Sequence, residues 1–165
     1  MRWTELPAPI DPVGLAVDDT GICSVRFGGA PVEAGPLLTT APDGILADAR
    51  DDLRRYFAGD EVDFAALPLS VRGGTDFERA VWKALSGIPY GEMRTYGQIA
   101  AEVGEPDAAR AVGTACNHNP LPIVVPCHRV VGADGKLVGF GGGVWRKKIL
   151  LELEARVRIE REFGL

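Results

Sequence analysis

The stretch TYGQIAAEVGEPDAARAVGTACN, residues 95–117, carries two helix signals separated by a short turn. Thr95 and Gln98 form a capping-box pattern, and apolar residues at helical spacing then predict a short helix that Gly104 ends. Pro106 suits the first turn of a further helix, which we place over residues 107–117. Two short helices joined around a glycine in this way are typical of a helix-turn-helix.

The second of these helices is expected to have two distinct faces. The inward face consists of small apolar residues, namely Ala108, Ala111, Val112 and Ala115. The outward face has one long cation among short side chains, namely Arg110, Gly113, Thr114 and Asn117. Such a face can approach a flat or grooved partner closely, with Arg110 reaching into it. The spacing leaves a second interpretation open, in which the helix packs on both sides and Arg110 is simply solvated.

The residues before this pair predict one more helix and a domain boundary. Thr75 and Glu78 form another capping box, and an apolar stripe continues to about Ser86. Arg72-Gly73-Gly74 precedes that helix and predicts a boundary between residues 1–72 and residues 73–165. We therefore expect a structural domain followed by a mainly helical domain.

Residues 1–72 predict a small α+β domain. Strand patterns cover residues 14–17, 22–27 and 64–71. Between them, Leu46, Ala49, Leu53, Tyr56 and Phe57 fall at helical spacing, and Gly59 follows as a stop signal. Cys23 lies in a strand pattern and is interpreted as a buried core thiol. The fold class expected for the whole chain is α+β.

Composition and charge narrow the possible functions. The chain is 46% hydrophobic and 25% charged, as in globular proteins, and no apolar run approaches the roughly 20 residues of a membrane span. With no visible signal peptide and three scattered cysteines, we expect a cytoplasmic protein with neither disulfides nor a zinc site. Residues 1–72 carry six basic and twelve acidic side chains, but residues 94–148 carry seven basic and four acidic. The second half is therefore better suited to a polyanionic partner.

A candidate nucleophile follows the apolar, strand-like residues 123–125. Pro126-Cys127-His128-Arg129 places a thiol beside a possible base, which is the arrangement of an activated thiolate. A bare Cys-His pair equally fits a buried core cysteine with a surface histidine. Because adjacent side chains of a strand point to opposite faces, His128 can act on Cys127 only if the chain turns there or a water bridges them.

A carboxylate that could orient His128 is expected in the last helix, over residues 145–161. Leu150, Leu151, Leu153 and Val157 form its apolar face. Glu154 lies on the same side, so it points toward the core, where a carboxylate requires a partner.

Pro126-Cys127-His128-Arg129-Val130 resembles the active-site signature of the O6-alkylguanine-DNA alkyltransferases, the methylated-DNA–protein-cysteine methyltransferases. The similarity covers about half the chain in the family's order and spacing. It runs through residues 75–84, 88–92, 95–98, 109–113, 119–120, 139–143 and 150–154. The resemblance implies a ribonuclease H-like N-terminal domain before a winged-helix-like, helix-turn-helix domain.

The resemblance also implies a role for each matching residue. Cys127 is the alkyl acceptor, His128 the base acting through a water, and Glu154 the group that orients His128. Asn119 ties the helix-turn-helix to the active-site segment, and Arg110 fills the gap left by the flipped-out guanine. Tyr96 presses on the nucleotide backbone and donates a proton to the leaving guanine. The base and alkyl pocket is formed by Pro122, Val130, Val138, Gly139, Phe140 and Gly141.

Double-stranded DNA containing O6-alkylguanine is the partner that the resemblance implies, approached from the minor groove. It implies a monomer, with several copies able to share one DNA, and O4-alkylthymine as a possible second substrate. Transfer to a cysteine requires no metal or organic cofactor. Phe140 stands where the family usually carries Tyr, which retains the aromatic wall without the hydroxyl.

Three alternatives to alkyl transfer are compatible with parts of the sequence. A cysteine hydrolase or acyltransferase could use Cys127, His128 and Glu154, but it leaves the helix-turn-helix without a role. A helix-turn-helix regulator requires no nucleophile. A lesion-sensing homologue that binds without transfer normally lacks the acceptor cysteine, so Cys127 counts against it. Cys116 is interpreted as a buried structural thiol rather than a second acceptor.

Overall fold

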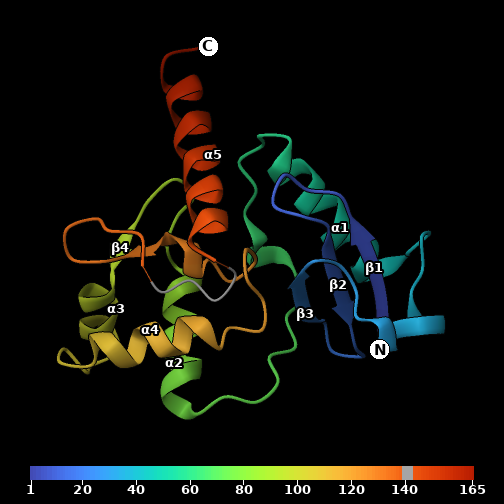
Figure 1. The fold of residues 1–165 in the computed structure, drawn as a ribbon, viewed down its shortest axis with the longest axis horizontal. Coiled ribbons are helices and arrows are strands. Elements are labelled where there is room, and N and C mark those ends of the chain that lie inside the picture. The colour runs from blue at the N-terminus through green and yellow to red at the C-terminus, as the bar shows by residue number, and fades with distance from the viewer. Residues whose placement is uncertain (139–142) are drawn as a thin grey trace. The chain divides into compact units, whose positions relative to one another are not determined.

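The computed structural model describes residues 1–138 and 143–165 of the chain (Figure 1). Three pocket residues expected from the resemblance, Gly139, Phe140 and Gly141, lie outside these ranges. The chain forms two compact units, Met1–Arg72 and Gly73–Leu165, and each is described by itself. Within the ranges described, every helix is too short or too polar to cross a membrane.

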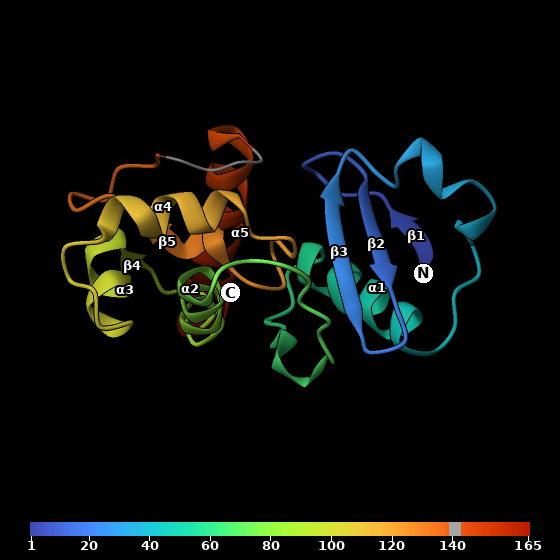
Figure 2. The same ribbon diagram turned by 90° about the horizontal axis from the view of Figure 1, so that it is seen from below.

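The first unit is built on an antiparallel sheet with the strand order β1-β2-β3 (Figure 2). Its elements are β1 (Arg2–Leu6), β2 (Val13–Val17), β3 (Ile22–Phe27), the 3-10 helix η1 (Val32–Leu37), α1 (Gly44–Phe57) and the 3-10 helix η2 (Phe64–Ala66). The middle strand β2 is buried along its whole length. α1 packs on the sheet and buries Leu46, Ala49, Leu53 and Tyr56.

Most of the elements predicted for this unit are confirmed, with two corrections. β2, β3 and α1 lie where expected, and Gly59 follows α1 with a φ of 97°, a conformation that glycine adopts without strain. Cys23 is buried, as predicted. β1 was not predicted, and the strand expected over residues 64–71 is wrong. That segment is η2 followed by a single bridge between Ile22 and Leu69, because Pro68 has no N–H to extend a ladder.

The second unit is mainly helical. Its elements are α2 (Asp76–Ser86), β4 (Arg94–Thr95), α3 (Tyr96–Glu102), α4 (Ala109–Asn117), the 3-10 helix η3 (Cys127–Arg129), β5 (Val130–Val131) and α5 (Val144–Glu162). α2, α3 and α4 pack on one another (Figure 1). With the sheet of the first unit, these helices confirm the α+β class.

Both predicted capping boxes are present. At Thr75 and again at Thr95, the hydroxyl accepts the N–H three residues on, and the side chain at that position accepts the N–H of the threonine. The Thr95 box starts α3 at Tyr96. Immediately before it, β4 pairs in parallel with β5, with Arg94 opposite Val130 and Thr95 opposite Val131. This pairing brings the start of α3 beside the end of η3.

Two local predictions in this unit require correction. α4 begins at Ala109 rather than Asp107, because the N–H of Ala108 donates to Glu105 and closes a turn there. Val112 and Ala115 are buried as expected, but Ala111 is exposed and the buried residue on that side is Cys116. The structural interpretation of Cys116 as a buried thiol is confirmed.

The strand-like residues 123–125 form a turn instead of a strand. Pro122 and Val125 make an isolated bridge, and Ile123 has a φ of 74°. Asn119 holds the turn closed: its Oδ1 accepts the N–H of Leu121 at 2.9 Å, and its Nδ2 donates to the carbonyl of Val125 at 2.8 Å. These apolar side chains are buried without a strand because the turn folds back into the core.

Candidate active site

Cys127 and His128 lie in η3, a single 3-10 turn that follows Pro126. His128 could act on Cys127 only if the chain turned here, because adjacent side chains of a strand point to opposite faces. The 3-10 turn meets that requirement. Both residues are buried, Cys127 at 5% exposure and His128 at 0%. The thiol and the imidazole are therefore both interior, on adjacent residues of one turn.

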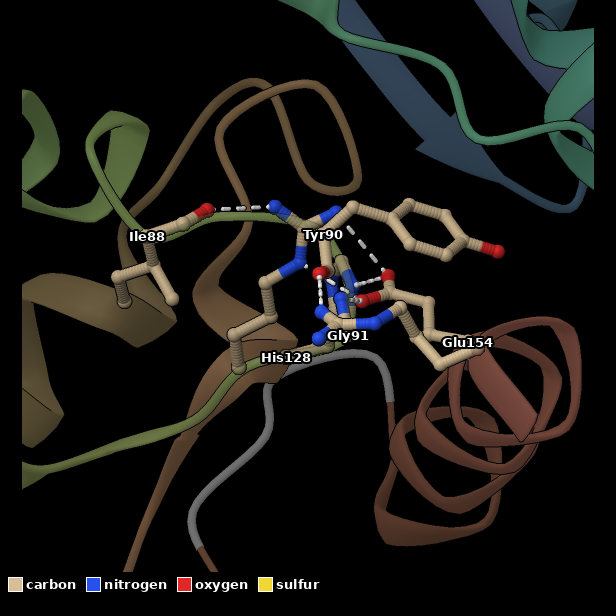
Figure 3. Close-up of polar contacts among 7 residues, drawn as sticks. Ile88, Tyr90, Gly91, His128 and Glu154 are labelled. Atoms are coloured by element: carbon tan, nitrogen blue, oxygen red, sulfur yellow. Dashed lines mark hydrogen bonds and ion pairs between the residues drawn. The ribbon is translucent and has the colours of Figure 1, made fainter. Parts of the chain in front are cut away.

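Glu154 extends from α5 to meet the imidazole (Figure 3). Its Oε2 lies 2.6 Å from Nε2 of His128, and the N–H of Gly91 donates to its Oε1 at 2.9 Å. His128 and Gly91 lie 26 and 63 positions from Glu154 in the sequence, and the His128–Glu154 contact is buried while the Gly91 contact is partly buried. The structure thus brings together the thiol-bearing turn, the histidine and the carboxylate.

Arg129 completes this cluster, although the motif alone gave no reason to assign it a role. Its Nε lies 2.9 Å from Oε1 of Glu154 and its Nη2 lies 3.2 Å from Oε2. Nη1 donates to the carbonyl of Ile88 at 2.7 Å, and the guanidinium lies 5.6 Å from the centre of the Tyr90 ring. A cation within a run of buried residues was the available signal, because a buried charge requires a partner.

The protonation states follow from this arrangement. Burial alone would raise the pKa of Glu154, but hydrogen bonds and charge from His128 and Arg129 outweigh it and hold the pKa well below the usual range. Burial lowers the pKa of His128; Glu154 opposes the shift, while the charges of Arg129 and Lys147 add to it. Both shifts favour an ionised Glu154 beside a neutral His128.

The tautomer of His128 is set by the same contacts. An ionised carboxylate only accepts hydrogen bonds, so Nε2 carries the proton and donates to Glu154. Nδ1 then has a lone pair, and it is buried with no hydrogen-bond partner in the part of the chain that the structure describes. Nδ1 is therefore the ring nitrogen that can accept a proton.

Cys127 rests as a thiol. Burial raises its pKa, although a hydrogen bond from the Asn119 side chain, the charge of Lys147 and nearby backbone N–H groups oppose the shift. These three opposing groups would stabilise a thiolate once it forms. Because the resting thiol is protonated, reaction at the sulfur requires a base.

Lys147 is a second residue that sequence reasoning missed. It is completely buried in the first turn of α5, and its Nζ donates to the Tyr96 hydroxyl at 3.2 Å and to the Val138 carbonyl at 3.1 Å. The Tyr96 hydroxyl in turn donates to the same carbonyl at 2.8 Å. Burial raises the pKa of Tyr96 to about 12, so its hydroxyl holds its proton at neutral pH.

The outward face of α4 is where the spacing placed it. Arg110, Thr114 and Asn117 are exposed, and Gly113 is half-buried. A Cβ added at Gly113 would lie 3.8 Å from Cε1 of Tyr96, so this face runs past the tyrosine.

The remaining predicted site residues vary in burial. Val130 is buried, Pro122 is half-buried and Val138 is exposed. Among the described residues, no group of three or more His, Cys, Asp or Glu side chains could hold a metal ion. The side chains present at this site are a thiol, an imidazole held by a carboxylate, a phenol and a buried ammonium.

Comparisons with known families cover both units. The model of the 6-O-methylguanine DNA methyltransferase DNA-binding domain matches residues 76–156. The model of the ribonuclease-like domain of the same methyltransferases matches residues 1–71. The ribonuclease-like character expected for the N-terminal domain is thereby confirmed.

Individual relatives match along nearly the whole chain. The methylated-DNA–protein-cysteine methyltransferase of Mycobacterium bovis is 47% identical over 154 residues, which cover 93% of this chain and 92% of the relative. The Methanosarcina acetivorans protein of the same name is 44% identical over 156 residues, covering 93% and 98%. The crystal structure of Mycobacterium tuberculosis OGT in complex with DNA is 46% identical, covers 95% of this chain and 94% of that one, and has a TM-score of 0.82.

Proposed function

This chain belongs to the 6-O-methylguanine DNA methyltransferase family, and from that premise we propose that it moves the alkyl group of O6-alkylguanine in DNA onto Cys127. The observation that carries the proposal is the buried relay at η3. Glu154 holds Nε2 of His128, which leaves the Nδ1 lone pair as the acceptor for the thiol proton. A relay of this kind prepares a sulfur nucleophile.

The reaction is a displacement at the alkyl carbon. The Cys127 thiol passes its proton through a bridging water to Nδ1 of His128, and the sulfur attacks the carbon bound to O6. The carbon–sulfur bond forms as the carbon–oxygen bond breaks, and the guanine leaves with the electron pair. The product on the protein is a thioether.

Tyr96 is proposed to protonate the departing guanine, which makes it a better leaving group. The Lys147 ammonium contacts the phenolic oxygen and can stabilise the negative charge that develops there. Asn119 contributes by holding the turn at residues 121–125 and by opposing the rise in the pKa of the Cys127 thiol.

A thioether on Cys127 cannot be hydrolysed by these groups, so each molecule is proposed to act once. Duplex DNA is the proposed partner, with the outward face of α4 in the minor groove and Arg110 in the base stack after the lesion has flipped out. Pro122, Val130 and Val138 are proposed to border the pocket for the flipped base. The protein is proposed to act as a monomer.

The test is to incubate the protein with an excess of duplex that carries one O6-methylguanine. The expected result is one methyl group per protein on Cys127, an equal amount of restored guanine and no further turnover. The control is Cys127→Ala, which should bind the duplex with nearly unchanged affinity but take no methyl group. Binding by the native protein without modification would identify a lesion sensor and overturn the proposal. Neither binding nor modification would also overturn it, in favour of a hydrolase.

A further inference from the structure

Arg129 is a buried cation that is fixed from three directions. Two of its nitrogens contact the two oxygens of Glu154, and a third donates to the carbonyl of Ile88. Its guanidinium also lies over the Tyr90 ring. This fork geometry is the strong, specific form of an arginine–carboxylate pair. Arg129 therefore has one fixed position beside the His128–Glu154 hydrogen bond.

The charges in this cluster limit the state of the histidine. With Arg129 charged and Glu154 ionised, the two charges cancel and the imidazole can stay neutral. Without Arg129, the carboxylate would be a buried charge lacking its cation, which is unfavourable. The group that would then bind a proton is His128, because imidazole is more basic than a carboxylate by about two pKa units.

We propose that Arg129 is a positioning residue that supplies the positive charge for Glu154 and thereby leaves the His128 ring neutral, with Nδ1 able to take the Cys127 proton. The use of that neutral ring in alkyl transfer rests on the proposed function. The effect on the ring itself does not, and it can be measured without DNA.

The other charged groups around the ring are consistent with this assignment. Lys147, from the first turn of α5, acts on His128 with the same sign as Arg129, whereas Glu154 acts in the opposite sense. Lys147 contacts Tyr96 and Val138, and Arg129 contacts Glu154. Of the two cations, Arg129 is thus the one that is paired with the carboxylate.

Nitrogen NMR of the free protein is the direct test, because the chain has two histidines. His118→Gln removes the signals of the exposed histidine, which pairs with Glu78 away from η3. In this background we expect His128 near pH 7 to be neutral, with the proton on Nε2. Arg129→Gln keeps a hydrogen-bond donor but removes the charge, and it should convert His128 to imidazolium. Arg129→Lys keeps the charge and should leave the ring neutral.

Transfer kinetics provide a second measurement on the same variants. A proton on Nδ1 blocks the base, so Arg129→Gln should lower the rate near pH 7 by about tenfold or more, since loss of a charge in direct contact shifts a pKa by about one to three units. The rate should recover as the pH is raised by that amount. Arg129→Lys should retain most of the rate near pH 7.

The outcomes separate the two proposals. A neutral His128 in Arg129→Gln, or a loss of rate that is equal at every pH, would overturn the role of Arg129. If Arg129→Gln does not fold, the double variant Arg129→Gln, Glu154→Gln removes both buried charges together. The His128 ring should be neutral in this double variant, and an imidazolium there would overturn the role of Arg129. If the native protein takes no methyl group while the NMR results hold, the proposed function fails and the effect of Arg129 on His128 stands.

Discussion

At the scale of single residues, Tyr96 is half-buried, and its hydroxyl contacts both Val138 and Lys147. The hydroxyl donates to the Val138 carbonyl and accepts from Lys147, and its raised pKa keeps the proton in place. In the proposed reaction, that proton is the one given to the leaving guanine. The same oxygen contacts Lys147 and is the proposed proton donor.

Tyr96→Phe should show both effects. General acids contribute about a hundredfold or more to rate, so transfer from duplex O6-methylguanine should slow by at least that factor. Loss of the hydroxyl also leaves Lys147 with one fewer partner, which should lower the free energy of unfolding by about 1–3 kcal/mol. Rapid-quench transfer assays and urea unfolding measure the two effects.

Alkylation of Cys127 by iodoacetamide serves as the control for Tyr96→Phe. This reagent supplies its own good leaving group, so its rate should be unchanged in the variant. A variant that transfers methyl groups at the native rate would show that Tyr96 is not the acid.

At the scale of elements, the helix caps fix the residue at which α2 and α3 begin. The N–H of Gln98 donates to the Thr95 hydroxyl at 3.0 Å, and the N–H of Glu78 donates to the Thr75 hydroxyl at 3.1 Å. The two caps are chemically alike. They differ in that the Thr95 cap starts α3 at Tyr96, whereas the Thr75 cap starts α2.

Thr95→Ala and Thr75→Ala therefore form a matched pair. Each should lower the free energy of unfolding by about 1 kcal/mol, the usual contribution of a threonine cap. Thr95→Ala should also slow methyl transfer, because Tyr96 is the first residue of α3 and the cap that fixes its position is lost. Equal transfer rates in the two variants, measured where both are folded, would show that the cap does not position Tyr96.

α4 presents Arg110 on its exposed face, and its proposed role is to occupy the space left by the flipped base. Arg110→Ala should therefore slow repair of duplex DNA by about tenfold or more, because unstacking a base costs a few kcal/mol. Reaction with the free base O6-methylguanine should be unaffected, since no stack has to be filled.

Arg156→Ala is the matched control for Arg110. It removes an exposed arginine from α5 in the same unit and should leave both reactions near native rates. Equal losses on duplex and free base in Arg110→Ala would rule out the intercalating role.

At the scale of the whole molecule, the buried cluster links stability to pH. His128 and Glu154 both have folded-state pKa values below their unfolded values. For each, the unfolded chain binds the additional proton, so stability is highest above the unfolded pKa and declines as the pH falls. The decline should begin near pH 6.5, the ordinary value for histidine, and steepen below the ordinary value for glutamate.

Unfolding of the second unit can be followed by the indole signal of Trp82, which donates to the Ala115 carbonyl at 2.8 Å. Between about pH 6.5 and 5, the free energy of unfolding should fall by up to about 1.4 kcal/mol per pH unit for the one proton on His128. His128→Gln should remove this slope, and His118→Gln should retain it. A native slope that persists in His128→Gln would assign it to other groups.

The helices, the caps and the inward position of Glu154 could be predicted from the sequence because their signals are local. A capping box is a contact between residues three apart, and the apolar face of α5 is a repeat along one helix. The adjacent Cys127-His128 pair is also a local signal, and it predicted a candidate nucleophile. Without the family resemblance, the pair alone could not distinguish an activated thiolate from a core cysteine.

Tertiary structure alone decided how the site is assembled. Residues 123–125 read as a strand from their side chains, yet Asn119 closes them into a turn and η3 then places thiol and imidazole in one interior. Arg129 and Lys147 became part of the site through contacts 41 and 51 residues away in sequence. A buried charge requires a partner, and here the partners come from segments that are distant in sequence. Periodicity along the chain reports only local contacts, so it could not identify these pairs.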